Sequence, residues 1–551
     1  MFIRFNKNSK GSTYVQVLRS YRENGKVRQQ VLFTFGRLDV LQATGQLDAL
    51  VQALSKHALK QQVIDMSKDL SVEQVYYLGV AHVVKRLMER LGLEKMFDKL
   101  AAKRPKLKLP WSAIITGMMM SRFIAPCSKR RLYAEQWQRI YPEILGNHRV
   151  SLMSFYRAMD VLWEEHETVE FALFDRFGER DLFDQELDVV FYDTTTLRFE
   201  SVDKQRGNLR RFGYSKEHRN DCTQVVLGLL VDGDGIPVGY ELFPGNTYDS
   251  KSLPAIIAKI RQKYRIRRFV VVADRGMITG DNLMQLRAAK MEFILGMRLW
   301  SLTEEEQKRI LQWRGYRPLN KEASAFLREI NYLGDRLIVS WTRERAMRDA
   351  QVRNDVLDKI RAQIKAKPKP KQFVTHKGYR QYLKGLEEGK PELDTEAIAA
   401  AQERDGFFGI LTNIPHAKLG SEEVYARYKD LWRIEDAFGE IKGPLETRPM
   451  FHWTDRRIQS HVLICLLSYY VEAVITRDLR KEKANFTVGE WFRALNEIHA
   501  IPIVVRGVRA WVRNEIRGVA VCGYELMHIK PPDRLLKLEK LDITQNVVTQ
   551  I

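Results

Sequence analysis

The chain has 551 residues, of which 45% are hydrophobic, so it can form more than one domain with an apolar core. Lysine and arginine number 90 against 69 aspartate and glutamate residues, and the net charge of +21 favours a polyanionic partner, with nucleic acid ahead of a membrane surface. The four cysteines are scattered without a CxxC pair, which argues against a disulfide framework and a zinc site.

The first 70 residues are expected to form a β-hairpin region. The segments TYVQVLRSYR and KVRQQVLFTF flank Asn24-Gly25, a dipeptide that favours a two-residue hairpin turn. The preceding residues, MFIRFNKNSKG, show no apolar leader, so we expect a protein of the reducing cytoplasm.

Residues 71–180 have a helical pattern, with SVEQVYYLGVAHVVKRLMERLG as the clearest amphipathic stretch. Lys129, Arg130 and Arg131 form a basic cluster within it. The longest apolar runs of the chain, at 111–120 and 461–475, are shorter than the roughly 20 residues that cross a bilayer. Both runs are therefore interpreted as buried helices, and no membrane partner is expected.

The apolar pattern changes at about residue 187. Three successive strands are predicted in ELDVVFYDTTTLRFES, CTQVVLGLLVD and PVGYELFPG. A helix, SLPAIIAKIRQKY, is followed by the strand RRFVVVADRG, the helix TGDNLMQLRAAK and the strand MEFILGMRL. The order β-β-β-α-β-α-β predicts an α/β fold with a mixed five-stranded sheet and flanking helices.

Residues 300–405 interrupt this rhythm and are expected to be an insertion domain. They are highly charged and include KAKPKPK at 365–371, which is not compatible with a regular helix. The strand FFGILTN resumes the pattern, and the apolar helix SHVLICLLSYYVEAVI follows later. We therefore expect one catalytic domain from 181–299 and 406–480, preceded by the helical region 71–180 and followed by a basic C-terminal region, 481–551.

The segment YKDLWRIEDAFGEIKG, residues 428–443, is predicted to be one amphipathic helix. Trp432 borders its apolar stripe and is expected in the core rather than stacked on a base. Tyr428, Glu435 and Lys442 recur every seventh residue, which places them on one face beside the apolar stripe. The stripe itself consists of Leu431, Ile434, Phe438 and Ile441.

Three acidic residues are candidates for a metal site. Asp193 ends the apolar run VVFYD, and Asp274 ends VVVAD, so both are expected where the carboxyl ends of adjacent strands form a ligand crevice. Glu435 can join them if residues 300–405 are set aside as an insertion. Converging carboxylates need a counter-ion, and ligands that are all oxygen select Mg²⁺ or Mn²⁺. Two such ions promote displacement at a phosphodiester.

The same segments resemble DDE insertion-sequence transposases, which have an RNase H-like catalytic fold. The resemblance is to the insertion-sequence-four superfamily and its 1634-like subgroup. It rests on VVFYDTTTLRF, VVADRGM and YKDLWRIEDAFGEIK, and on the connecting segments FGYSKEHRNDCTQVVLGLL and ELFPGNTYDSKSL. The family signature Tyr-x2-Arg-x3-Glu-x6-Lys matches at Tyr428, Glu435 and Lys442, whereas Leu431 occupies the arginine position.

The resemblance implies metal-dependent cut-and-paste transposition in a bacterial cytoplasm. Asp193, Asp274 and Glu435 would be the catalytic metal ligands and would coordinate two Mg²⁺ or Mn²⁺ ions. The partners would be the terminal inverted repeats, the target DNA and a second copy of the chain. By analogy, the basic helical region 71–180 would recognise the element ends. The expected DNA-binding residues are Tyr428, Lys442, Arg198, His218, Lys129, Arg130 and Arg131.

Two alternatives remain at this point. A transposase-derived protein that binds DNA without cleaving it is kept open by Leu431. A phosphatase of the haloacid dehalogenase type is suggested by VVFYDTTT, but that chemistry needs a second aspartate at the position of Thr195. Inverted repeats beside the coding sequence would favour the transposase.

Overall fold

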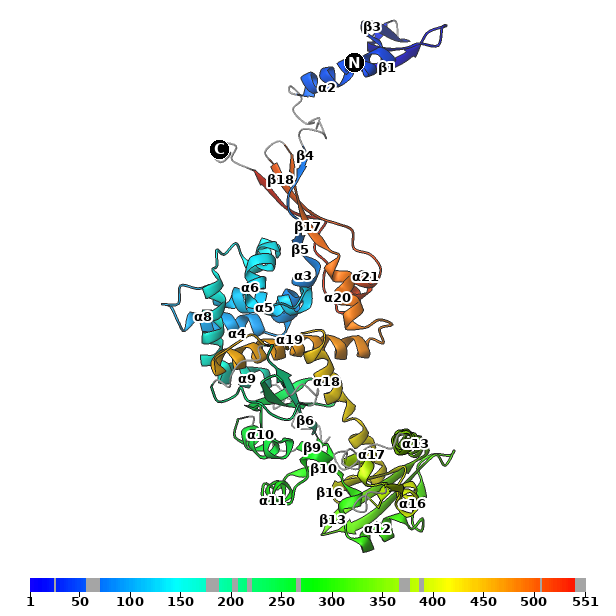
Figure 1. The fold of residues 1–551 in the computed structure, drawn as a ribbon. Coiled ribbons are helices and arrows are strands. Elements are labelled where there is room, and N and C mark those ends of the chain that lie inside the picture. The colour runs from blue at the N-terminus through cyan, green and yellow to red at the C-terminus, as the bar shows by residue number, and fades with distance from the viewer. Residues whose placement is uncertain are drawn as a thin grey trace. The chain divides into compact units, whose positions relative to one another are not determined.

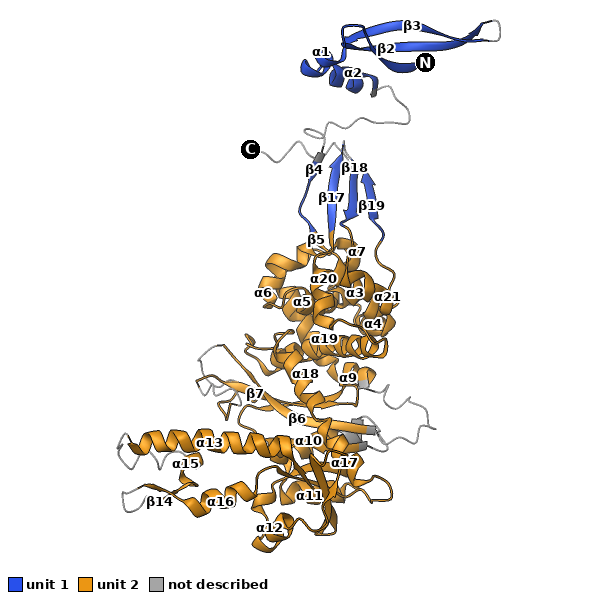
Figure 2. Ribbon diagram, turned by 90° about the vertical axis from the view of Figure 1, so that its right-hand side faces the viewer, with its two compact units in different colours: residues 1–75, 500–514, 533–551 blue, residues 76–499, 515–532 orange. Residues whose placement is uncertain are grey.

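A computed structural model describes residues 1–23, 26–55, 70–174, 188–200, 207–215, 221–263, 269–365, 377–385, 391–505 and 508–540. Three predicted features lie outside the described residues: the Asn24-Gly25 turn, His218 and most of the KAKPKPK run. The chain divides into two units, one of residues 1–75, 500–514 and 533–551, the other of residues 76–499 and 515–532 (Figure 2).

The smaller unit begins with the predicted hairpin, which is confirmed. β2 (Thr13–Glu23) pairs antiparallel with β3 (Lys26–Arg37), and β1 (Phe2–Lys7) adds a third strand on the other side of β2. Val15 and Leu18 of β2 are buried, and the short helices α1 (Leu38–Ala43) and α2 (Gln46–Ser55) follow. A second sheet combines distant parts of the sequence, in the order β19 (Leu535–Lys540), β18 (Val508–Arg513), β17 (His499–Val505) and β4 (Leu70–Val72).

The larger unit contains a helical layer built on two apolar helices (Figure 1). α5 (Trp111–Ile124) and α19 (Asp455–Lys481) pack against each other, and α8 (Leu152–Glu164) packs against both. In the described part of the chain, α19 alone is long and apolar enough to span a bilayer, but 94% of its apolar window is buried inside the protein. The other helices of this layer include α3 (Gly79–Arg90), α4 (Leu93–Ala102), α9 (His166–Phe174) and α20 (Val488–Asn496).

The predicted mixed sheet forms the centre of the larger unit. Five neighbouring strands are β8 (Pro237–Pro244), β7 (Gln224–Val231), β6 (Asp188–Arg198), β9 (Phe269–Ala273) and β10 (Glu292–Met297). β6, β9 and β10 run parallel, whereas β7 is antiparallel to both of its neighbours. This arrangement is consistent with an RNase H-like core.

The expected strand number of five was too low, because the sheet has nine strands among the described residues. The additional strands are β16 (Phe407–Thr412), β13 (Asp335–Thr342), β12 (Ala325–Tyr332) and β11 (Arg317–Pro318). β16 pairs with β10, and the hairpin of β12 and β13 pairs with β16. Part of the segment expected to be an insertion domain therefore continues the central sheet.

The two faces of β6 are covered by different helices. The Tyr192 hydroxyl donates to Ser252 Oγ at 2.7 Å, and the Thr194 hydroxyl donates to Asp249, both on α10 (Asp249–Lys263). Side chains alternate along a strand, so Asp193 points to the opposite face. α18 (Trp432–Lys442) packs against β6 and β7, and since α10 covers the face of Tyr192, α18 lies on the face of Asp193.

Candidate active site

Asp193 and Asp274 follow the last paired residues of two adjacent parallel strands. Tyr192 of β6 is opposite Ala273 of β9, so the next residue on each strand is an aspartate at the same level. The prediction that these strands are neighbours is therefore confirmed. Asp193 is half-buried and accepts a hydrogen bond from the Thr194 backbone N–H at 2.7 Å, while Asp274 is half-buried where β9 ends.

The helix predicted over 428–443 is in fact two helices, α17 (Ser421–Lys429) and α18, with a turn at Asp430 and Leu431. In this turn the Leu431 N–H donates to the Tyr428 carbonyl at 3.1 Å, a tighter spacing than in an α-helix. The predicted apolar stripe of Leu431, Ile434, Phe438 and Ile441 is buried. Glu435 and Lys442 share α18, whereas Tyr428 lies on α17, so the inference of one common helix was wrong.

Tyr428 contacts the second aspartate directly. Its hydroxyl donates to Asp274 Oδ1 at 3.3 Å. Burial, followed by the negative charge of Asp274, raises the pKa of Tyr428 above its ordinary value, so the phenol remains a proton donor. Gly296 on β10 leaves the space for this hydroxyl, because a Cβ at that position would overlap it.

Asp274, Tyr428 and Glu435 line one cleft of about 1260 Å³. Its lining also includes four arginines, namely Arg275 after β9 and Arg343, Arg345 and Arg348 at the start of α13 (Arg343–Lys365). The Arg345 guanidinium lies 4.6 Å from the centre of the Phe408 ring, which is 5.1 Å from the Tyr428 ring. The cleft thus combines carboxylates with cations.

Sequence reasoning did not single out the arginines of α13, although RERAMR carries three of them within six residues. These arginines line the cleft because α13 directly follows the hairpin of β12 and β13. The charged composition of this region did not indicate that hairpin. Trp432 was expected in the core, but its side chain is 46% exposed and lines the cleft. The expectation was wrong because α18 begins at Trp432, outside the buried stripe.

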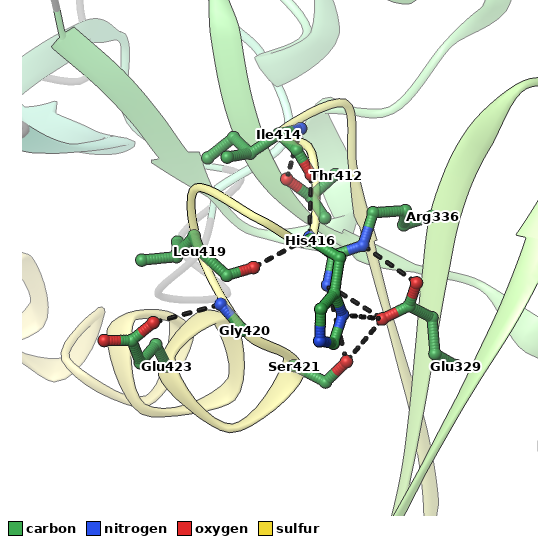
Figure 3. A network of polar contacts seen from close by, with 9 residues as sticks. All are labelled: Glu329, Arg336, Thr412, Ile414, His416, Leu419, Gly420, Ser421 and Glu423. Carbon is green, nitrogen blue, oxygen red and sulfur yellow. Dashed lines mark hydrogen bonds and ion pairs between the residues drawn. The ribbon is translucent and has the colours of Figure 1, made fainter.

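A polar network holds the start of α17 against the added hairpin (Figure 3). Arg336 of β13 donates to the carbonyls of Ile414 and Leu419 at 2.7 and 2.9 Å, and to both carboxylate oxygens of Glu329 at 3.0 and 2.8 Å. The Ser421 hydroxyl and His416 also contact Glu329. These donors, Arg336 first, lower the pKa of Glu329 to about 2. The network fixes the loop that leads into the helix bearing Tyr428.

The candidate carboxylates fit a divalent cation in chemistry and in strand position. Their ligand atoms are all oxygen, which suits Mg²⁺ or Mn²⁺. Asp274 and Glu435 face one cleft. Asp193 lies within the neighbouring strand β6, not at its carboxyl end as expected, and is not part of the cleft lining. Within the described ranges, no three His, Cys, Asp or Glu side chains are close enough together to hold an ion as they stand. The side chains of Asp193, Asp274 and Glu435 therefore do not converge on one point in this structure.

The other predicted DNA-binding residues that the structure describes do not line this cleft. Lys442 is half-buried at the end of α18, and Arg198 is half-buried at the end of β6. Arg130 and Arg131 are exposed on the short helix α6 (Lys129–Arg131), whereas Lys129 is only 3% exposed. The structure therefore brings together Asp274, Tyr428 and Glu435 and separates the basic cluster from them.

Comparisons with known proteins place these observations in a family. A family model described as "Transposase DDE domain" matches residues 184–471, and one described as "IS1634 family transposase, N-terminal domain" matches residues 3–63. A search of curated proteins gave no match. The solved "Cryo-EM structure of piggyBac transposase synaptic complex with hairpin DNA (SNHP)" aligns with a TM-score of 0.35 and 10% identity, over 77% of this chain and 82% of that chain.

Proposed function

Because the chain belongs to the DDE transposases of the IS1634 family, we propose that it catalyses metal-dependent cut-and-paste transposition of an insertion sequence. The observation that carries this proposal is the placement of Asp193 and Asp274 on adjacent parallel strands, with the helix of Glu435 on the face of Asp193. The expected reactions are strand cleavage by water at the element ends and strand transfer by the freed 3′-hydroxyl.

In this proposal Asp193, Asp274 and Glu435 hold two Mg²⁺ or Mn²⁺ ions. When bound, such ions activate the attacking oxygen and stabilise the leaving oxygen of a phosphodiester displacement. The protonated Tyr428 hydroxyl orients Asp274 through their hydrogen bond. Trp432 presents an exposed ring at the cleft, where it can contact a DNA base.

The arginines of the cleft supply phosphate contacts in this proposal. Leu431 has replaced the signature arginine and is buried at 9% exposure, so its position contributes no charge to the DNA. Arg275 and Arg345 are the proposed substitutes, because both line the cleft and both lie close enough to Tyr428 to act on its pKa. An arginine can hold a phosphate through two parallel hydrogen bonds.

The proposed partners are the terminal inverted repeats, the target DNA and a second copy of the chain, in a bacterial cytoplasm. The excess of positive charge supports a DNA partner. Arg130, Arg131, Arg198 and Lys442 remain proposed contacts to DNA outside the cleft.

The test is cleavage of a duplex carrying the inverted repeat that flanks the coding sequence. We expect Asp193→Ala, Asp274→Ala and Glu435→Gln each to abolish Mg²⁺-dependent cleavage while the affinity for the duplex is kept. Glu422→Gln is the matched control, because Glu422 is exposed on α17 and outside the cleft lining. Cleavage by any of the three variants would remove that residue from the proposed site. Binding without cleavage by the unmodified protein would instead support the alternative of an inactive DNA-binding protein.

A further inference from the structure

A second cavity lies in the helical layer of the larger unit. Its volume is about 760 Å³, and it is bounded by the end of α5, by α6 and by the segment that leads into α19. Five of its lining residues are lysine or arginine, whereas Glu446 is the one carboxylate in the described lining. We call it the α6 pocket.

Arg122 is a buried cation of the α6 pocket. Its side chain belongs to a residue that is 3% exposed, and its guanidinium donates to the carbonyls of Cys127, Leu445 at 3.3 Å and Glu446 at 3.4 Å. Its Nε is buried and has no hydrogen-bond partner among the residues that the structure describes. These carbonyl groups fix the orientation of the guanidinium. None of these partners is a carboxylate that would neutralise its positive charge.

Lys129 is the second buried cation, also 3% exposed. Its Nζ donates to His461 Nδ1 at 3.4 Å, and His461 Nε2–H donates to the Thr447 carbonyl at 3.1 Å. Burial and then the charge of Arg122 lower the pKa of Lys129 to about 7. Burying cations without an anion costs free energy, which a bound anion in the pocket would offset.

The wall of the α6 pocket carries exposed aromatic rings. Phe451 is 57% exposed and Trp453 is 43% exposed. The same segment is joined to the end of the strand that bears Asp193, because the Met450 N–H donates to the Arg198 carbonyl at 3.1 Å. Cations interleaved with exposed aromatic rings are typical of surfaces that bind single-stranded nucleic acid.

We propose that the α6 pocket binds a phosphate group of a single-stranded nucleic acid, with Arg122 and Lys129 providing the charge and Phe451 and Trp453 contacting a neighbouring base. This inference rests on the proposed function for its choice of DNA as the phosphate source. Free phosphate offers the same charge, so the experiment must separate the two sources.

The experiment measures fluorescence anisotropy of a labelled oligonucleotide of ten thymidines with the full chain. We expect Lys129→Met to weaken binding about tenfold, since a hydrogen bond to a charged group is lost. Trp453→Leu should weaken binding to a similar degree by removing a stacking surface. Lys95→Met is the matched control, because Lys95 is an exposed lysine of α4 outside the pocket lining, and it should change the affinity less than twofold.

Two further arms make the result decisive. Inorganic phosphate or thymidine monophosphate in the millimolar range should compete weakly; displacement of the oligonucleotide by phosphate alone at lower concentration would show a free-anion site and overturn the proposal. Wild-type affinity in both Lys129→Met and Trp453→Leu would also overturn it and leave Lys129 with a structural role. Glu435→Gln should bind the oligonucleotide normally even though it does not cleave, so failure of the cleft and failure of the α6 pocket are distinguishable.

Discussion

Replacing Arg336 should release the helix that carries Tyr428. Arg336 makes two hydrogen bonds to Glu329, at 3.0 and 2.8 Å, and two to the carbonyls of Ile414 and Leu419, at 2.7 and 2.9 Å. The Arg336 and Glu329 side chains are 13% and 32% exposed. An exposed ion pair contributes up to about 1 kcal/mol, and breaking a buried one costs about 3–5 kcal/mol. For this partly buried group we expect Arg336→Ala to cost about 3 kcal/mol of local stability.

The assay is amide hydrogen exchange of α17, followed by mass spectrometry. A loss of about 3 kcal/mol corresponds to exchange that is faster by on the order of a hundredfold, if the amides exchange through local opening. Arg361→Ala is the control, because within the described part of the chain Arg361 forms an exposed ion pair with Asp358 on α13, at 2.9 Å, and no other ion pair. Exchange of α17 in Arg336→Ala at the same rate as in the control would refute the view that this network anchors the helix.

Three other changes test the site and its support. Gly296→Ala should lower the cleavage rate in a duplex-cleavage assay, because the added Cβ displaces the Tyr428 hydroxyl; Gly276→Ala, whose Cβ would meet no atom of the described residues within 4 Å, should not. The lowered pKa of Glu329 stabilises the fold in full above its ordinary value of 4.5, and this contribution should be lost as the pH falls towards about 2; acid unfolding of Glu329→Gln should lack that component. Ile434→Ala should cost about 2–5 kcal/mol in urea unfolding and Ile434→Val about 0.5–1.5 kcal/mol, since this side chain is fully buried; equal costs would contradict its core position.

The aspartate pair could be predicted from the sequence because strand and chemistry coincide there. Both VVFYD and VVVAD are apolar runs that end in a carboxylate, and the intervening segment has the right length and pattern for adjacent parallel strands. The family resemblance then linked the pair to Glu435. The apolar stripe of α18 was equally visible, because burial imposes the helical period on the sequence.

The break between α17 and α18 is not indicated by the sequence pattern. Leu431 keeps a right-handed helical backbone, with φ −58° and ψ −22°, so the apolar period continues through the turn. The β12 and β13 hairpin was hidden for a different reason, because the adjacent charged residues Arg328 and Glu329 interrupt the apolar pattern in the middle of β12. The turn at Leu333 and Gly334, both with positive φ, is the signal that marks it. Because α13 begins directly after β13, the hairpin places the arginines of α13 at the cleft.

In the proposed function, Asp193, Asp274 and Glu435 together coordinate divalent ions. Anomalous diffraction from crystals of the full chain soaked in Mn²⁺ tests it most directly. We expect Mn²⁺ peaks within coordination distance, about 2–2.5 Å, of carboxylate oxygens from all three residues, and loss of at least one peak in Glu435→Gln. Mn²⁺ bound elsewhere, with these carboxylates left uncoordinated, would contradict it.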